Sequence, residues 1–390
     1  MTPANDRSES TDSPVQTLPT DPETDRAEDG VALCLSGGGY RAMLFHAGVL
    51  WRLNEFGWLP RLARISSVSG GSITAAMLGL SWSRLRFDRN GVAAAFDALV
   101  VQPIRALADH TIDAPDIVKG ILMPGSVADH VAKSYDAHLF HHATLQDLPD
   151  APRFIFNATN VQSGALWRFS KPYMRDWRVG EVKDPTLALA DAVGASAACP
   201  PFLSPMRLQL REDSFTPNSG ADLQRPPFTT EVCLTDGGVY DNLGLETAWK
   251  RYRTILVSDG GVKMAAEERP HGDWARHAVR VNDLIDNQVR SLRKRQVIRS
   301  FQRGIRSGTY WGIRTPIAAY GLKNTLPCPL DATLDLAATP TRLKRLEPER
   351  QEQLVNWGYA LCDAAMRAHV DASLPAAQKF PYTVGVLANA

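Results

Sequence analysis

The sequence predicts an α/β fold in which helices cover the faces of a mostly parallel sheet. Two observations support this prediction. A short apolar run, a glycine cluster and an apolar helical stretch follow one another, and a second unit of the same kind comes directly after the first. Later apolar runs end in Asp-Gly-Gly. Alternation of strand and helix is typical of parallel sheets, whose strands are buried on both faces and therefore read as continuous apolar runs.

The first unit predicts a strand over 31–35 and a helix over 42–56, which ends at Gly57. The second predicts a strand over 64–68 and a helix over 70–80. Glycine is typical just past the end of a helix, because it adopts a left-handed conformation without steric cost. Both helical stretches are mostly apolar, so we expect them to be buried.

The rest of the chain continues the alternation with less regularity. Residues 209–228 are polar and rich in turn formers, which indicates a surface loop. Apolar periodicity predicts further helices at 91–109, 128–140, 185–195, 243–251, 275–304 and 349–370, and strands at 154–159, 166–169, 232–235 and 254–258.

The distribution of charge and the length of the chain indicate how it is organised into domains. Residues 1–30 hold eight acids and two bases and almost no large apolar side chain, which predicts a disordered acidic tail. They have no apolar core, so they do not resemble a signal peptide. We expect residues 31–390 to form one domain, with its motifs in 31–261 and a helical part in 262–390 that completes it; a separate second domain is the alternative.

The composition argues against several classes of protein. Lys and Arg total 43 against 42 Asp and Glu, so net charge gives no reason to expect nucleic acid. No stretch is long and apolar enough to span a bilayer. The five cysteines are scattered without metal-ligand spacing, so we expect free thiols in the cytoplasm and neither metal nor cofactor.

Ser69 is the candidate nucleophile. It lies between a predicted strand and a predicted helix, where a tight turn would expose its hydroxyl if the flanking residues are small. Here Ser67, Gly70 and Gly71 are small. The alternative is that Ser69 only caps the helix.

Gly37, Gly38 and Gly39 follow the first predicted strand, and we expect their N–H groups to bind an oxyanion. Arg41 would hold this loop or approach an anionic headgroup. The run from Gly37 to Ala42 also fits the dinucleotide fingerprint G-x-G-x-x-A, but Glu55 precedes the second strand, whereas that fingerprint needs an acid at its end.

Asp236 is the candidate base. It ends an apolar strand, where α/β proteins place their sites, and Gly237 and Gly238 follow it. Asp259, in Asp259-Gly260-Gly261, is its rival. No histidine lies in a motif; the candidates for a triad are His271, His277 and His369.

These segments resemble the patatin-like phospholipase family over about residues 31–261. The glycines at 37–39 with Arg41 match its oxyanion loop, Ser69 with Gly71 its nucleophile turn, and Asp236 with its two glycines its base turn. The segment Ala195-Ser196-Ala197-Ala198 is also similar to the family. Ala42 and Ser67 depart from the pattern, since each replaces a glycine.

The resemblance implies a three-layer α/β/α sandwich and a Ser-Asp dyad without histidine. It also implies a lipid acyl hydrolase of phospholipase A or lysophospholipase type that needs no metal. The alternatives are an esterase or thioesterase on soluble substrates, a nucleotide-binding oxidoreductase, and a catalytically silent lipid-binding module.

The helix predicted at 275–304 carries two periodic sets of side chains. Arg295, Arg299, Arg303 and Arg306 form a basic stripe, and Val281, Ile285, Val289 and Leu292 form an apolar face. One interpretation packs the apolar face on the core and leaves the arginines solvated. The other is that the stripe draws the protein to an anionic membrane surface.

Overall fold

The computed structural model describes residues 27–112 and 126–387. Residues 1–26 of the predicted acidic tail lie outside the described residues. The chain joins the sheet from Glu28 onward, three residues before the predicted start of the first strand.

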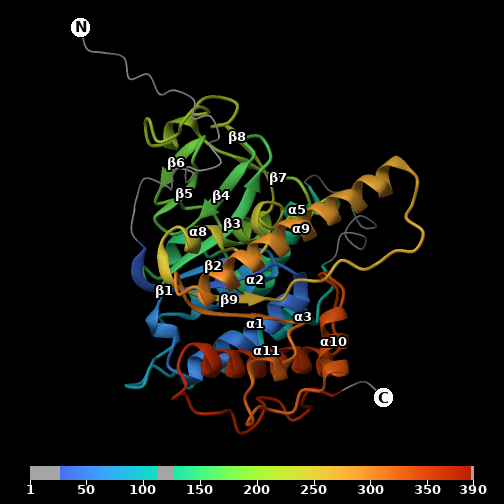
Figure 1. Cartoon of the computed structure of the whole chain (residues 1–390). Coiled ribbons are helices and arrows are strands. Elements are labelled where there is room, and N and C mark those ends of the chain that lie inside the picture. Colours follow the sequence, from blue (N-terminus) through green and yellow to red (C-terminus); the bar gives the residue numbers. More distant parts are fainter. Residues whose placement is uncertain (1–26, 113–125, 388–390) are drawn as a thin grey trace.

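A ten-stranded sheet forms the middle of the molecule (Figure 1). Five strands in the order β10-β9-β1-β2-β3 are parallel, which confirms the predicted parallel centre. Their bounds are Ser307–Gly312, Tyr252–Asp259, Glu28–Leu35, Leu62–Ser67 and Arg153–Asn160.

An antiparallel extension follows on the far side of β3, and the sequence did not predict its form. Strands β4, β5 and β6 continue the sheet, while β8 pairs with β3 and β7. Their bounds are Ala165–Phe169, Tyr173–Asp176, Gly180–Lys183, Glu231–Asp236 for β8 and Met206–Gln209 for β7.

Strand β2 and strand β8 lie along the same edge of β3 and meet end to end. Strand β2 pairs in parallel with Arg153 to Phe156 of β3, and β8 pairs antiparallel with Ala158 to Asn160. The opposite edge of β3 is occupied by β4. The last residues of β2 and β8 therefore point toward each other, and this junction positions the candidate site.

Helices cover both faces of the sheet, as a three-layer sandwich requires. Alternate side chains of β1 serve the two layers: Leu33 and Leu35 join the core under α1, α2 and α11, while Ala32 and Cys34 pack against α8 and α9. The helices are α1 Gly39–Glu55, α2 Gly70–Ser81, α3 Gln102–Ala108, α5 Val127–Tyr135, α6 Leu189–Ser196, α7 Gly238–Asp241, α8 Glu246–Trp249, α9 Trp274–Gln302, α10 Leu330–Ala338 and α11 Pro348–His369.

Candidate active site

Ser69 lies in the sharp turn between β2 and α2. Its backbone has φ 52° and ψ −122°, a left-handed conformation that a serine adopts only at a cost of about 1–3 kcal/mol. Two close approaches hold the turn: a Cβ on Gly70 would collide with the carbonyl oxygen of Gly39, and one on Gly71 would lie 2.5 Å from that of Leu35. The two glycine clusters of the sequence are therefore in direct contact.

A buried network of hydroxyl groups accounts for a serine in place of glycine at position 67. Ser67 Oγ donates to the Ile155 carbonyl oxygen at 3.2 Å and accepts from Ser72 Oγ at 3.0 Å. Ser72 Oγ lies in turn 2.8 Å from Ser196 Oγ. All three hydroxyls are buried beneath the nucleophile turn, so Ser67 adds hydrogen bonds there.

Asp236 meets Ser69 at the junction of β2 and β8. Hydrogen bonding from the Ser69 side chain and from the Gly238 N–H, 2.6 Å from Oδ1, favours the carboxylate form. Burial outweighs both, since Asp236 is only 6% exposed, and it raises the pKa of the carboxyl to about 7. The buried pair thus combines a hydroxyl with a carboxyl group that titrates near neutrality.

Asp236 reaches this position for a different reason from the one the sequence suggested. We expected it at the common edge formed by the carboxyl ends of parallel strands, but β8 is antiparallel to β3 and runs the other way. Asp236 pairs with Ala158 of β3, two residues beyond the last residue of β3 that pairs with β2. Ser69 and Asp236 meet because their strands approach head-on.

The segment Ser196–Ala198 joins the two turns, a role that was not predicted from the sequence. The Ser69 N–H donates to the Ser196 carbonyl oxygen at 3.2 Å and to its Oγ at 3.0 Å. The same carbonyl oxygen accepts from the Gly237 N–H at 3.3 Å, and the Ala198 carbonyl oxygen accepts from the Asp236 N–H at 2.9 Å. The sequence signals for it were the run of small residues at the end of α6 and the similarity of Ala195-Ser196-Ala197-Ala198 to the patatin-like family.

The glycine loop lies beside Ser69 with some of its donors unused. Within residues 27–112 and 126–387, the N–H groups of Gly38, Gly39 and Gly70 have no hydrogen-bond acceptor. Gly38 and Gly39 have φ of 145° and 59°, a backbone conformation that residues other than glycine rarely adopt. These donors are available to an anion.

Two residues predicted for the oxyanion site are engaged elsewhere. The Gly37 N–H donates to the Asn242 carbonyl oxygen at 3.1 Å, so Gly37 is not a free donor. Arg41 is fully buried, and its guanidinium donates to the carbonyl oxygens of Gly260 and Thr339 and to Thr341 Oγ1. The arginine therefore ties the loop to the C-terminal part of the chain and cannot approach a headgroup.

The rival carboxylate, Asp259, lies in a separate ion pair. Lys294 Nζ is 2.5 Å from its Oδ2, the Tyr310 hydroxyl donates to the same oxygen at 2.7 Å, and the Gly261 N–H donates to Oδ1 at 2.9 Å. These partners outweigh burial and lower the pKa of Asp259 to about 2.

None of the three candidate triad histidines, all within the described residues, contacts Ser69 or Asp236. His271 precedes α9, His277 lies on its exposed N-terminal part, and His369 ends α11 beside Tyr320. Glu55, the candidate ribose ligand of the nucleotide interpretation, forms an ion pair with Arg52 at the far end of α1.

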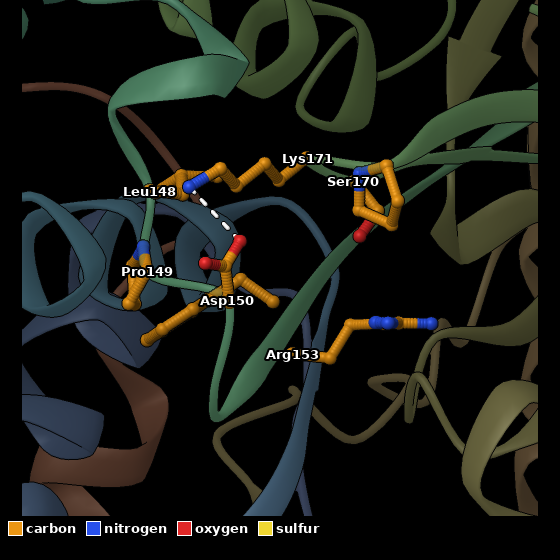
Figure 2. Close-up of a pocket in the computed structure, with 8 residues that line it drawn as sticks. Leu148, Pro149, Asp150, Arg153, Ser170 and Lys171 are labelled. Carbon is orange, nitrogen blue, oxygen red and sulfur yellow. Dashed lines mark ion pairs between the residues drawn. The ribbon is translucent and has the colours of Figure 1, made fainter. Parts of the chain in front are cut away.

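Two surface hollows lie away from the Ser69 hydroxyl. Figure 2 shows the smaller, about 50 Å³, where Asp150 pairs with Lys171 at 3.0 Å near the start of β3. The larger, about 800 Å³, is open and lined by Trp177, Arg178 and Tyr240 among others. Neither is lined by Ser69, which is 8% exposed, or by Asp236.

Two further observations concern the described part of the chain. It contains no cluster of three or more His, Cys, Asp or Glu side chains arranged to hold a metal ion. None of its helices combines the length and the apolar character needed to traverse a bilayer.

Comparison with known proteins gives one family. Residues 33–249 match the sequence model described as patatin-like phospholipase. No curated protein matches the chain.

Several solved structures are similar at low identity. Human GIVD cytosolic phospholipase A2 in complex with methyl γ-linolenyl fluorophosphonate is 14% identical, with a TM-score of 0.48 over 86% of this chain and 57% of that one. Another structure of the human protein is 14% identical, with a TM-score of 0.40 over 59% and 45%. VipD from Legionella pneumophila is 15% identical, with a TM-score of 0.35 over 88% and 67%. The chain thus spans about half the length of the human protein chains.

Proposed function

Because the chain belongs to the patatin-like phospholipase family, a family of lipid ester hydrolases, we propose that it cleaves carboxylic esters of lipids with a Ser69–Asp236 dyad. One observation carries the proposal. The Ser69 hydroxyl, held in a strained turn, contacts a buried carboxyl group whose pKa is about 7. A base with a pKa near the working pH is ionised often enough to act and basic enough to accept a proton.

In the first half of the proposed reaction Ser69 Oγ attacks the ester carbonyl carbon and its proton passes to Asp236. The carbonyl oxygen becomes an oxyanion, for which the free N–H groups of Gly38, Gly39 and Gly70 are the available donors. The C–O bond to the alcohol then breaks, and the alcohol leaves with the proton held by Asp236. The product is an acyl-Ser69 ester.

In the second half a water molecule attacks the acyl carbon while Asp236 accepts its proton. The intermediate collapses to release the fatty acid, and the proton returns to Ser69 Oγ. Asp236 thus acts as base and then acid in each half, without a third residue.

Fluorophosphonate labelling tests the nucleophile directly. We expect the wild-type chain to be labelled at Ser69, as located by peptide mass spectrometry, and Ser69→Ala to be neither labelled nor active. Loss of a catalytic serine removes most of the rate enhancement, on the order of 10⁴-fold or more. Ser83→Ala is the matched control, since Ser83 is an exposed serine just beyond the end of α2. A folded Ser69→Ala variant with full activity would contradict the dyad.

The finer class is a phospholipase A or lysophospholipase, acting in the cytoplasm. The five cysteines, all described and all free, support a reducing compartment. A lipid panel read by mass spectrometry identifies the headgroup and acyl position. Activity confined to short soluble esters or thioesters would favour the esterase alternative, and lipid binding without turnover would favour a silent binding module.

A further inference from the structure

Helix α9 exposes an apolar stripe to solvent. Its N-terminal half projects beyond the body of the molecule at the upper right of Figure 1. The prediction that its apolar face packs on the core is wrong: Trp274 is 85% exposed, Ile285 54% and Leu292 56%. Eight of the sixteen large hydrophobic side chains exposed in the described residues lie on this helix. The buried side chains of α9 are Arg290, Val297 and Ser300.

On α9 the exposed apolar stripe is followed by the basic stripe of arginines along the same face of the helix. At 100° per residue, Ile285, Leu292, Arg299 and Arg303 fall within a narrow sector, with Arg295 at its border. Within the described part of the chain, none of these three arginines forms an ion pair with a carboxylate. The outer face is therefore apolar in its first half and cationic in its second.

The acids of α9, and the ion pairs that join it to α7, α8 and β9, lie on the inner face. Its only acidic residues are Asp283 and Asp286, on the side opposite Leu292, and Asp286 pairs with Arg290 at 2.9 Å. The outer face thus carries no negative charge that would repel an anionic surface.

The inner face contacts the helix that contains the end of the base turn, and also the rival carboxylate Asp259. Arg293 lies 3.7 Å from Asp241, the last residue of the base turn helix α7, and Lys294 pairs with Asp259. The charge of Asp286 also contributes to the raised pKa of Asp236. The helix therefore passes beside the edge of the molecule that carries Ser69.

Two further exposed apolar side chains lie near the candidate site. Phe202, 72% exposed, follows the segment Ser196–Ala198 that joins the catalytic turns. Val239, also exposed, lies in the base turn itself. An exposed apolar stripe such as that of α9 marks a site of interaction.

We propose that the outer face of α9 docks on anionic phospholipid bilayers, with the stripe from Trp274 to Leu292 in the headgroup–acyl boundary and Arg295, Arg299 and Arg303 against lipid phosphates. Amphipathic helices with this combination lie in the plane of the membrane surface. The claim that docking delivers Ser69 to its substrate rests on the proposed function. The docking itself does not depend on it.

The charge pattern favours a bilayer over a second copy of the chain. Parallel pairing along the stripe would set arginines against arginines. Antiparallel pairing would set them against Ile285 and Leu292 of the other copy and strip their hydration. A bilayer supplies acyl chains for one half and phosphates for the other.

Vesicle co-sedimentation tests the proposal on the full chain, with phosphatidylcholine vesicles and with equal mixtures of phosphatidylcholine and phosphatidylglycerol. We expect binding to the mixed vesicles that weakens with salt. Arg295→Gln/Arg299→Gln/Arg303→Gln should lower the affinity by about 100-fold, from the contribution of three bases near an anionic surface. Ile285→Ser/Leu292→Ser should lower it as well. The matched control, Arg84→Gln/Arg86→Gln/Arg89→Gln, changes three exposed arginines beyond the far end of α2 and should leave binding intact.

Two further measurements separate this proposal from the dyad. Hydrolysis of a short soluble ester should be unchanged in all the α9 variants, and Ser69→Ala should still bind vesicles. Undiminished vesicle binding in the α9 variants would overturn the docking proposal and leave the dyad untouched. So would an apolar-stripe variant that changes only the oligomeric state, measured by light scattering, because the stripe would then contact a second copy.

Discussion

The two Asp-Gly-Gly turns of this chain share a sequence, and they differ in the partners and in the pKa of the carboxyl group. Asp236 ends β8, contacts Ser69 and has its pKa raised to about 7 by burial. Asp259 ends β9, pairs with Lys294 and has its pKa lowered to about 2. Both carboxylates are buried and each accepts a hydrogen bond from the N–H two residues on. The comparison shows that a cation partner, and not the motif or the degree of burial, decides whether the carboxylate can act as a base.

The largest expected difference between the turns is in catalysis. Asp236→Asn should lower kcat for ester hydrolysis by about 10³-fold or more, because an amide keeps the shape but cannot accept the Ser69 proton. Asp259→Asn is the matched control and should keep most of the rate. Steady-state kinetics on a soluble ester makes the measurement. If Asp259→Asn were the inactive variant, the assignment of the base would be reversed.

The pH dependence of the rate sharpens the same comparison. Asp236 must be ionised to accept a proton, so kcat/KM should fall about tenfold per pH unit below its pKa of about 7 and level off above it. Asp259 is already ionised throughout this range, so Asp259→Asn should keep the midpoint. A wild-type midpoint near pH 4 would mean that burial does not raise the pKa of the Asp236 carboxyl.

Replacing the aspartate of each turn by asparagine should change thermal stability in opposite directions. The folded-state pKa of Asp236 is raised, so its ionisation destabilises the fold as pH rises from about 4 to about 7; Asp236→Asn should then be the more stable protein at pH 8, by up to a few kcal/mol at about 1.4 kcal/mol per pKa unit.

Asp259 acts in the opposite direction. Its folded-state pKa is depressed, so its stabilisation is present above about pH 4 and is lost as pH falls toward 2. Asp259→Asn should lower the free energy of unfolding at pH 7 by about 2–3 kcal/mol. Differential scanning calorimetry of both variants at pH 5 and pH 8 tests the pair, and equal shifts in Tm would remove the distinction.

The smallest expected effect is that of chelators. The carboxylate oxygens of both turns already have partners: N–H and hydroxyl groups at Asp236, and a lysine and a tyrosine at Asp259. Hydrolysis of a soluble ester in EDTA should therefore equal that in buffer. Loss of activity that a single divalent ion restores would show that a carboxylate of this chain binds metal.

The sequence predicted four of the five parallel strands because they carry continuous apolar runs, and in β1, β2 and β9 glycines follow closely. It missed β5, β6 and β7, which are four residues long and too short to show periodicity. It also missed β10, whose two glycines and polar side chains conceal it.

At the site, local motifs predicted Ser69 and Asp236 as the catalytic candidates, the second by an argument about sheet edges that does not apply to β8. The use of the Gly37 N–H by Asn242 and the anchoring of both turns by Ser196 arise from contacts between distant segments. Local patterns carry no signal for such contacts. The same limit applies to α9, whose apolar periodicity predicted burial although its partner face is absent from the described chain.

The contact between Gly70 and Gly39 also bears on how this molecule can evolve. A side chain added at position 70 would collide with the backbone at 39, and one added at 39 would lie within 3.0 Å of the Arg342 backbone. Selection can thus alter neither glycine without moving a second segment of the chain as well. Evolutionary change is therefore easier at positions outside this joint.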